Sequence, residues 1–465
     1  MRAEFVQTEW FRGFVGALAS AGVTDVVVSP GSRSTPLVAA AVGEPRLHVL
    51  TVLDERSASF VALGLGRASG RPTVLVRTSG SAGGHDLPAI IEADEACVPL
   101  ITVTADRPPE LRRSGASQTI DQHGLFGARV RSFTDLGPPS LEGLRSVFRR
   151  AAEVVADARG PRPGPVHVNA PARKPLEPVS AESPEERALS VQVDARVRDP
   201  LRVVAARESF GPAALADVRD VLASARCGAV IAGPRRGPLP GPGLMRFLEA
   251  SGFALVAEAS SGLARIRHVE AHDWIDAPER LDVVIGVGAQ PTSKALQGLR
   301  ARAERLVVVD PWSIIDPDHA AVAAFLGPVD PWFEAAARGL EPRSASHRDG
   351  WRAAGARARA VIREALRQEE LSEGAAVADV VGRLNANCAL VLGNSLPIRM
   401  VDRYADAPPG HVFTQRGASG IDGLIAGAVG ISLEQPGPTV LLLGDVSFAH
   451  DVSSLASARL VSEPL

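Results

Sequence analysis

Short apolar runs alternate with helix-like segments along most of this 465-residue chain. Near the start, Phe5, Trp10, Phe14 and Leu18 recur at helical spacing. β-rich runs follow at 25–29, 47–53, 73–78, 99–104 and 165–169, with helix-like segments at 56–69, 86–97 and 141–158. Strands that are apolar throughout and joined by helical crossovers are typical of a parallel sheet covered on both faces.

The same alternation recurs twice further along the chain. The second set of strands is expected at 227–232, 253–258, 281–287 and 306–310. The third set comprises helices at 374–385 and 421–433, strands at 388–393 and 439–444, and a last helix at about 449–460. A proline-rich stretch around 171–200 and a polar, Arg-rich segment at 339–370 separate the three sets.

These patterns predict an α/β protein of three doubly wound parallel-sheet domains, the third incomplete because it has too few strands. We place the domains at 1–180, 201–340 and 341–465, with 181–200 as a linker.

The charge balance and the cysteines exclude several classes of protein. Lys and Arg number 50 against 53 Asp and Glu, so the chain has no global attraction to nucleic acid or to an anionic membrane. The three cysteines are too far apart for a zinc site or a disulfide framework. No apolar run is long enough to span a membrane, and the charged N-terminus is not a signal peptide. We therefore expect a soluble, cytoplasmic protein.

Polar clusters follow the predicted strands of the first domain, where the ligand sites of parallel sheets lie. Ser29–Thr35 fits either an anion site or a helix N-cap made by Ser32 or Ser34. Leu53–Ser57 carries either a helix-start charge or a catalytic acid. Thr78–Gly84 is a small-residue loop without a Walker lysine, and Arg107 at a strand end suits a carboxylate ligand.

The third domain has comparable clusters at 393–399 and 415–422. Asp445 follows Gly444 at the end of an apolar strand, a position that suits either a Mg²⁺ ligand beside a phosphate or a helix cap. Lys294 is one of only two lysines, which makes an ordinary surface role less plausible for it.

The ordered set of motifs resembles one enzyme family. It comprises Ser29-Pro-Gly-Ser-Arg-Ser-Thr-Pro-Leu37, Asp54-Glu-Arg-Ser-Ala58, Thr104-Ala-Asp-Arg-Pro-Pro-Glu-Leu111, Arg416-Gly-Ala-Ser-Gly-Ile-Asp422 and Gly444-Asp445. Together they are similar to the menaquinone-pathway 2-succinyl-5-enolpyruvyl-6-hydroxy-3-cyclohexene-1-carboxylate synthases, which depend on thiamine diphosphate. The resemblance runs from about Gly13 to the end and is weakest between 180 and 280.

The resemblance implies an architecture of the thiamine diphosphate-enzyme type. The first domain would bind the aminopyrimidine, the second would be a Rossmann-like spacer, and the third would bind the diphosphate with Mg²⁺, or Mn²⁺ as an alternative. It also implies a homodimer or homotetramer, with the cofactor between the first domain of one subunit and the third of another. The implied reaction decarboxylates 2-oxoglutarate and adds the succinyl-semialdehyde carbanion to isochorismate.

Individual roles follow from the matched motifs. Glu55 corresponds to the glutamate that protonates the aminopyrimidine, Asp445 to a metal ligand, and Ile421 to the residue that supports the bent cofactor. Thr78, Ser79, Gly80 and Gly444 would contact the cofactor together with Ile421. The positions that match substrate contacts, rich in the cations that dicarboxylates require, are Ser32, Arg33, Arg107, Gln118, Lys294, Ser395, Arg399 and Arg416.

Some positions depart from the family pattern. His85 and Asp86 stand where an Asn and an aromatic residue are usual, and could alter the pocket or face solvent. Ser117 replaces a common Asn, and the family's Asn-Asn-Gly metal motif does not occur after Asp445. We therefore expect a truncated chain that binds the cofactor poorly. Two alternatives stay open: a carboligase of the acetolactate-synthase kind, and a non-catalytic homologue or assembly subunit.

Overall fold

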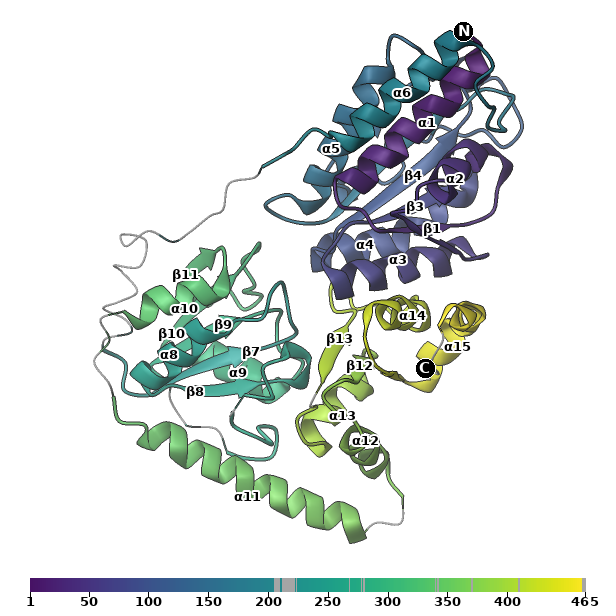
Figure 1. Ribbon diagram of the computed structural model, residues 1–465. Coiled ribbons are helices and arrows are strands. Elements are labelled where there is room, and N and C mark those ends of the chain that lie inside the picture. Colours follow the sequence, from purple (N-terminus) through teal and green to yellow (C-terminus); the bar gives the residue numbers. More distant parts are fainter. Residues whose placement is uncertain are drawn as a thin grey trace. The chain divides into compact units, whose positions relative to one another are not determined.

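The computed structural model describes residues 1–204, 210, 222, 224–266, 268–276, 278, 281–338, 340, 343–368, 371–408 and 410–461. The chain divides into two compact units (Figure 1). The first combines Met1–Ala205 with Gly417–Gln435 and Asp445–Leu465, and the second combines Ala206–Arg416 with Pro436–Gly444.

The first unit is built on a parallel sheet of the predicted kind. Its strand order is β2-β1-β3-β4-β6-β5, and every pair is parallel. The strands are β1 (Asp25–Val28), β2 (His48–Thr51), β3 (Thr73–Arg77), β4 (Leu100–Asp106), β5 (Phe133–Asp135) and β6 (Pro165–Pro171). The sequence did not predict β5, because three half-exposed residues carry no periodic signal.

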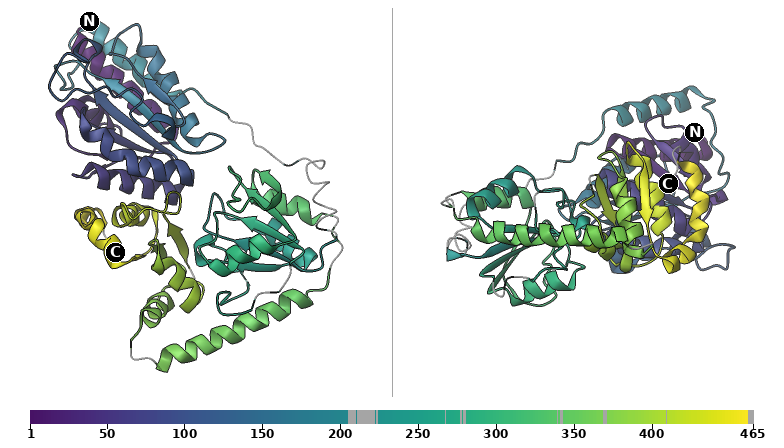
Figure 2. Two further views of the ribbon diagram at one scale, coloured as in Figure 1. Left: turned by 180° about the vertical axis from the view of Figure 1, so that it is seen from behind. Right: turned by 90° about the horizontal axis from the view of Figure 1, so that it is seen from below.

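Helices cover both faces of this sheet, as the apolar strands require (Figures 1 and 2). One core packs under α1 (Ala3–Ser20), α2 (Thr35–Val42), α5 (Leu144–Arg159) and α6 (Pro184–Arg198). The opposite core packs under α3 (Glu55–Ser69), α4 (Leu87–Ala96) and α14 (Leu424–Glu434). Gly64 lies against the backbone of α14, where a Cβ would come within 2.2 Å of the Gly427 carbonyl oxygen.

The segment predicted as a linker contains a capped helix. Ser183 and Glu186 form a reciprocal capping box at the start of α6. Leu189 and Val193 are buried in the core that α1 also covers. Apart from Pro200, which follows α6, the prolines of residues 171–200 precede or begin this helix. Pro184 lies in its first turn, where proline is compatible with a helix.

The second unit holds a five-stranded parallel sheet of order β11-β10-β9-β7-β8. Its strands are β7 (Gly228–Ala232), β8 (Ala254–Ala257), β9 (Val283–Val287), β10 (Arg305–Asp310) and β11 (Ala321–Leu326). Helices α8 (Pro242–Ser251) and α10 (Val329–Ala337) contribute to one core, and α9 (Lys294–Arg302) to the other. Strand β11 was not predicted, since its alternating burial lacks the continuous apolar run of the central strands.

The polar segment 339–370 is largely one helix, α11 (Ser346–Gln368). Trp351, Gly355, Arg359 and Ile362 are its buried residues, and their spacing forms one helical stripe. This narrow stripe is hard to recognise among so many arginines.

A three-stranded sheet of order β13-β12-β14 also belongs to the second unit. Its strands are β12 (Ala389–Leu392), β13 (His411–Thr414) and β14 (Thr439–Leu442), and helices α12 (Glu373–Gly382) and α13 (Leu396–Tyr404) pack on it. The predicted last helix is wrong in form: α15 (Asp445–His450) is followed by a 3-10 helix over Val452–Leu460.

Each sheet contains a reversal of strand order: between β1 and β3 in the first, between β7 and β9 in the second, and between β12 and β14 in the third. Ligands of doubly wound sheets bind outside the carboxyl ends of strands at such reversals. Among the described residues, no helix is long and apolar enough to cross a membrane.

Candidate active site

The loops that follow β1 and β3 meet at the carboxyl edge of the first sheet. A Cβ at Gly31 would lie 2.3 Å from the Cβ of Thr78, so only glycine permits this approach. Neither Ser32 nor Ser34 makes a side-chain cap at the helix starts that follow Gly31 and Ser34. The predicted Ser32 and Thr78 loops are therefore neighbours, and the N-cap alternative does not explain the serines.

Hydrogen bonds join the predicted residues after β3 and β4. Arg107 Nη1 donates to Ser79 Oγ over 3.0 Å, and Ser79 Oγ donates to the Gln118 carbonyl over 3.0 Å. Gln118 returns a bond from Nε2 to the Ser79 carbonyl, also at 3.0 Å. Gly80 has a φ of 90°, a conformation that favours glycine. Ser79, Gly80, Arg107 and Gln118 thus form one connected group.

A residue that sequence reasoning missed supports this group. Gln122 is buried and accepts the Gly80 amide proton at Oε1 over 3.1 Å. Its Nε2 donates to Asn169 Oδ1 over 2.9 Å, which ties the loop to β6. The Gln122 position falls within a motif that the sequence highlights, but no local pattern reveals its partner 47 residues away.

Arg33 is buried beside this group. Its Nη1 donates to the Ala172 carbonyl over 2.8 Å, while its buried Nε has no partner among the described residues. Burial lowers the pKa of the Arg33 guanidinium, and the positive charge of Arg107 lowers it further. Two neighbouring guanidinium groups with spare donor capacity are a suitable environment for an anionic ligand.

Two acidic residues, Asp54 and Glu55, follow β2 and differ in their contacts. Asp54 is the N-cap of α3 and accepts the Ser57 amide proton over 2.7 Å. Glu55 begins the helix and is only half-buried. Asp54 is therefore the side chain that caps the helix, and Glu55 is the acidic residue of its first turn.

His85 and Asp86, which depart from the family pattern, differ in their exposure to solvent. His85 is exposed, whereas Asp86 is fully buried beside Arg77. His85 therefore faces solvent, and Asp86 belongs to the interior of the loop cluster.

In the second unit, the predicted residues form a smaller group. Arg399 on α13 donates from Nη1 to the Ser395 carbonyl over 2.6 Å, and Arg416 Nη1 donates to Asn394 Oδ1 over 3.3 Å. Ser395 has a φ of 72°, an uncommon conformation for a residue with a side chain. Lys294 begins α9 on the other sheet, and its exposed Nζ donates to Gln297 Oε1 over 3.0 Å.

The motif around Ile421 is held in the first unit by two buried carboxylates that sequence reasoning missed. Glu92 on α4 accepts the amide protons of Gly417 and Ala418 over 2.9 and 2.7 Å. Asp451 accepts those of Ile425 and Ala426, over 2.7 and 3.2 Å, at the start of α14. Ile421 itself is half-buried. These contacts join residues far apart in the chain, so local patterns do not reveal them.

Some of the residues present fit thiamine diphosphate, because they offer a hydrogen-bond donor without a partner in the described part of the chain, or leave space for a ligand. Thr78 Oγ1 is buried without a partner among the described residues, next to the glycine contact described above. Asp445 is exposed at the first residue of α15, and a Cβ at Gly444 would meet no atom within 4 Å. No three His, Cys, Asp or Glu side chains of the described residues cluster as a metal site. Metal binding at Asp445 would therefore depend on other oxygen ligands as well.

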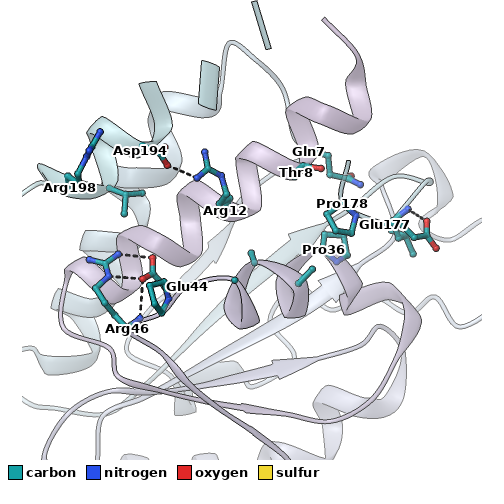
Figure 3. Close-up of a pocket in the computed structure, with 16 residues that line it drawn as sticks. Gln7, Thr8, Arg12, Pro36, Glu44, Arg46, Glu177, Pro178, Asp194 and Arg198 are labelled. Atoms are coloured by element: carbon teal, nitrogen blue, oxygen red, sulfur yellow. Dashed lines mark hydrogen bonds and ion pairs between the residues drawn. The ribbon is translucent and has the colours of Figure 1, made fainter. Parts of the chain in front are cut away.

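A separate cavity of about 530 Å³ lies in the first unit among α1, α2 and α6 (Figure 3). Arg12 pairs with Asp194, and Arg46 pairs with Glu44, along its wall. None of the predicted site residues lines this cavity, which is therefore distinct from the carboxyl edge of the sheet.

Comparison with known proteins supports the fold and the importance of the carboxyl edge of the first sheet. Residues 10–125 match the family described as "Thiamine pyrophosphate enzyme, N-terminal TPP binding domain". This range contains β1 to β4 and the loops that carry Ser32, Glu55 and Thr78. The fold and the match place the chain in the class of thiamine diphosphate-dependent enzymes.

Curated relatives define the family more narrowly. Proteins named 2-succinyl-5-enolpyruvyl-6-hydroxy-3-cyclohexene-1-carboxylate synthase from Sorangium cellulosum, Chloroflexus aurantiacus and Geobacillus kaustophilus are 40%, 38% and 39% identical to this chain. The alignments cover 97%, 97% and 96% of this chain and 78%, 80% and 80% of the relatives. The chain belongs to this synthase family. The relatives favour the synthase over a carboligase of the acetolactate-synthase kind.

Proposed function

We propose that this chain decarboxylates 2-oxoglutarate and adds the resulting succinyl-semialdehyde unit to isochorismate, forming 2-succinyl-5-enolpyruvyl-6-hydroxy-3-cyclohexene-1-carboxylate and CO₂ in menaquinone biosynthesis. Membership of the synthase family supports the reaction. The observation that carries the assignment to this edge is the division of roles between Asp54, which caps α3, and Glu55, which does not.

Glu55 is the proposed proton donor. Thiamine diphosphate, when bound, supplies an electron sink for the decarboxylation. Glu55 would hold its carboxyl proton toward a ring nitrogen of the aminopyrimidine and so bias the tautomer of that ring. Thr78, Ser79 and Gly80 would contact the cofactor from the loop after β3, where the Thr78 hydroxyl is unpartnered among the described residues.

Substrate recognition requires cations, because both proposed substrates are dicarboxylates. Arg33 and Arg107 supply them at the first sheet, with Ser32 and Gln118 as neutral donors. Lys294, Arg399 and Arg416 supply them in the second unit, together with Ser395. Arginine suits this task, since its planar fork can bind both oxygens of a carboxylate.

The remaining assignments are further proposals. The ranges 1–180, 201–340 and 341–465 would act as pyrimidine-binding, central and diphosphate-binding domains. Asp445 would bind Mg²⁺ or Mn²⁺, with Ile421 and Gly444 beside the cofactor.

A homodimer or homotetramer is supported by the exposed apolar side chains of Val446, Phe448, Val452 and Leu455. Free cysteines, two of them buried, accord with a cytoplasmic location.

The reaction can be tested with 2-oxoglutarate, isochorismate, thiamine diphosphate and Mg²⁺ in one assay. At saturating thiamine diphosphate and Mg²⁺, product formation by the parent chain would support the proposed reaction, whereas its absence from cofactor-loaded protein would support a non-catalytic homologue instead. Glu55→Gln should slow exchange of the cofactor C2 proton by about 10²- to 10⁴-fold, the usual contribution of general acid–base catalysis. An unchanged exchange rate would remove Glu55 from the proposed role.

Charge recognition can be tested separately. Arg399→Ala or Arg416→Ala should weaken use of at least one substrate by a few kcal/mol in kcat/KM, about the value of a lost charged hydrogen-bond pair. Arg383→Ala is the matched control, because Arg383 is an exposed arginine paired with Asp379 on α12. Parent-like kcat and KM for both substrates would withdraw Arg399 and Arg416 from the site.

A further inference from the structure

The fully buried ion pair between Arg77 and Asp86 is not accounted for by the proposed catalytic roles. Arg77 is the last residue of β3, and Asp86 ends the 3-10 helix Ser81–Asp86. Arg77 Nε donates to Asp86 Oδ1 over 2.8 Å, and both side chains have 0% exposure. Such a pair seldom improves stability over an apolar pair of similar size, so its presence points to a positional role.

The other nitrogen atoms of Arg77 reach two of the catalytic loops. Nη2 donates to the Glu55 carbonyl oxygen over 3.1 Å, and Nη1 donates to Ser29 Oγ over 3.2 Å. Strand β3 is not adjacent to β2 in the sheet, since β1 lies between them. One guanidinium group therefore links the carboxyl ends of three strands.

Asp86 fixes the direction of this fork. Its bond to Nε occupies one edge of the guanidinium, which leaves both Nη atoms aimed at Glu55 and Ser29. Burial raises the pKa of Asp86 to about 6, against the opposing effect of Arg77. The negative charge of Glu55 also acts on Asp86, which places the two acidic groups within electrostatic reach of each other.

We propose that Arg77, held by Asp86, is a positioning residue that sets the first turn of α3 and thereby the place of the Glu55 carboxyl group. This proposal rests on the proposed function, because it gives Glu55 the proton-transfer role. Asp86, which departs from the family pattern, would then serve to hold Arg77 in this position. Neither residue needs to touch substrate or cofactor.

The test separates positioning from stability by removing both charges together. In Arg77→Leu/Asp86→Leu no buried charge is left unpaired, so the unfolding midpoint should stay within about 4 °C of the parent. The bonds to Glu55 and Ser29 are lost nonetheless. We expect faster amide hydrogen exchange over residues 54–59 in the cofactor-free protein, and C2-proton exchange of bound thiamine diphosphate slowed by about a hundredfold.

A second, largely buried ion pair provides the matched control. Arg236 Nε donates to Asp310 Oδ2 over 3.0 Å at the carboxyl end of β10, where the Asp310 side chain is fully buried and that of Arg236 is 9% exposed. Arg236→Leu/Asp310→Leu should leave amide exchange over 54–59 and C2-proton exchange at parental rates. Parental values of both quantities in the Arg77/Asp86 double variant would overturn the proposal.

Arg77→Lys covers the case in which the double variant fails to fold. Lysine keeps a positive charge beside Asp86 but lacks the fork that reaches Glu55 and Ser29 together. It should show the same loss of amide protection, and parental protection would overturn the proposal. The Glu55→Gln variant distinguishes the role of Glu55 from that of Arg77. If this variant leaves C2-proton exchange unchanged, the proposed function of Glu55 fails. Amide exchange over residues 54–59 still decides whether Arg77 positions the turn.

Discussion

Asp86 near the carboxyl end of β3 and Glu258 directly after β8 both have side chains with no exposed surface, each at the edge of its own sheet. Asp86 is compensated by a cation, Arg77, at 2.8 Å. Glu258 accepts from neutral donors, namely Thr292 Oγ1 over 2.9 Å and the Ser293 amide over 2.8 Å. The same chemical group is thus buried in two different ways.

The way in which each carboxylate is buried affects its pKa. Burial raises the pKa of Glu258 to about 7, with the hydrogen bonds from Ser293 and Thr292 and the charge of Arg416 opposing it. Burial also raises the pKa of Asp402, and the nearby charges of Glu258 and Asp273 raise it further. Burial also raises the pKa of Asp86 to about 6 although Arg77 opposes the shift, so neither the cation nor the neutral donors fully offset burial. In the second unit, where Glu258 accepts from neutral donors, we expect a proton to complete the compensation.

The largest effect should come from removing the countercharge. Arg77→Met leaves Asp86 buried without a cation and should lower the free energy of unfolding by about 3–5 kcal/mol at pH 8. Urea denaturation, with amide exchange in β3 to identify the first unit, measures this loss. Arg113→Met is the control, because Arg113 is 83% exposed. A loss no greater than that of the control would mean that Asp86 does not depend on the cation.

Glu258 should produce a smaller, pH-dependent effect. Its ordinary pKa near 4.5 rises to about 7 in the folded state, so the folded state binds more protons between these values. Its contribution to stability is therefore fully present below about pH 4.5 and is lost as pH rises to about 7, by roughly 3 kcal/mol in total.

Glu258→Gln tests this pH dependence, because glutamine keeps an acceptor for Thr292 and Ser293 without a charge. The variant should have a flatter stability profile between about pH 4.5 and 7 than the parent, and higher stability above it. Urea titrations at a series of pH values measure both profiles. Glu249→Gln on the surface of α8 is the control. An identical slope in parent and Glu258→Gln would contradict protonation as the means of compensation.

Glu92 provides an intermediate case, since it combines a cation with backbone donors. It accepts from Arg67 Nη2 over 2.7 Å and from the amides of Gly417 and Ala418. Glu92→Gln should cost about 1–3 kcal/mol and speed amide exchange at Gly417 and Ala418. Glu95→Gln on the same helix is the control. Unchanged exchange at the two amides would show that Glu92 does not hold the motif.

The smallest effects should come from helix caps in the two units. Ser183 caps α6 within a complete capping box, whereas Ser372 caps α12 by a single bond to the Ala375 amide over 3.2 Å. Ser183→Ala and Ser372→Ala should each cost about 1 kcal/mol, with the larger loss at Ser183. Thermal unfolding compares them. A larger loss at Ser372 would show that the box adds nothing to α6.

Local patterns predicted much of the fold. The central strands β1, β3, β4, β7 and β9 were recognisable because continuous apolar runs are confined to strands buried on both faces. Strands β5, β11 and β13 were missed; each is an edge strand that includes exposed residues and so lacks a run that is buried throughout. Helix α11 was missed because its buried stripe of four residues is sparse among charged ones.

The candidate site divides along the same line. Its loops could be placed from the sequence, because motifs at strand ends are contiguous and parallel strands bring their ends to one edge. Glu92 and its partners Gly417 and Ala418 could not, since the separations of 325 and 326 residues carry no local signal.

The sequence by itself determined the class of fold, the order of the strand-end motifs and the family to which the chain belongs. These depend on periodicity and on contiguous residues. Only the tertiary structure decided that Asp54 caps α3 while Glu55 does not, that His85 faces solvent, and that Asp86 pairs with Arg77. The reason is physical: burial and charge pairing depend on which side chains the folded sheets bring into contact, and the same residue types in the same order permit both outcomes.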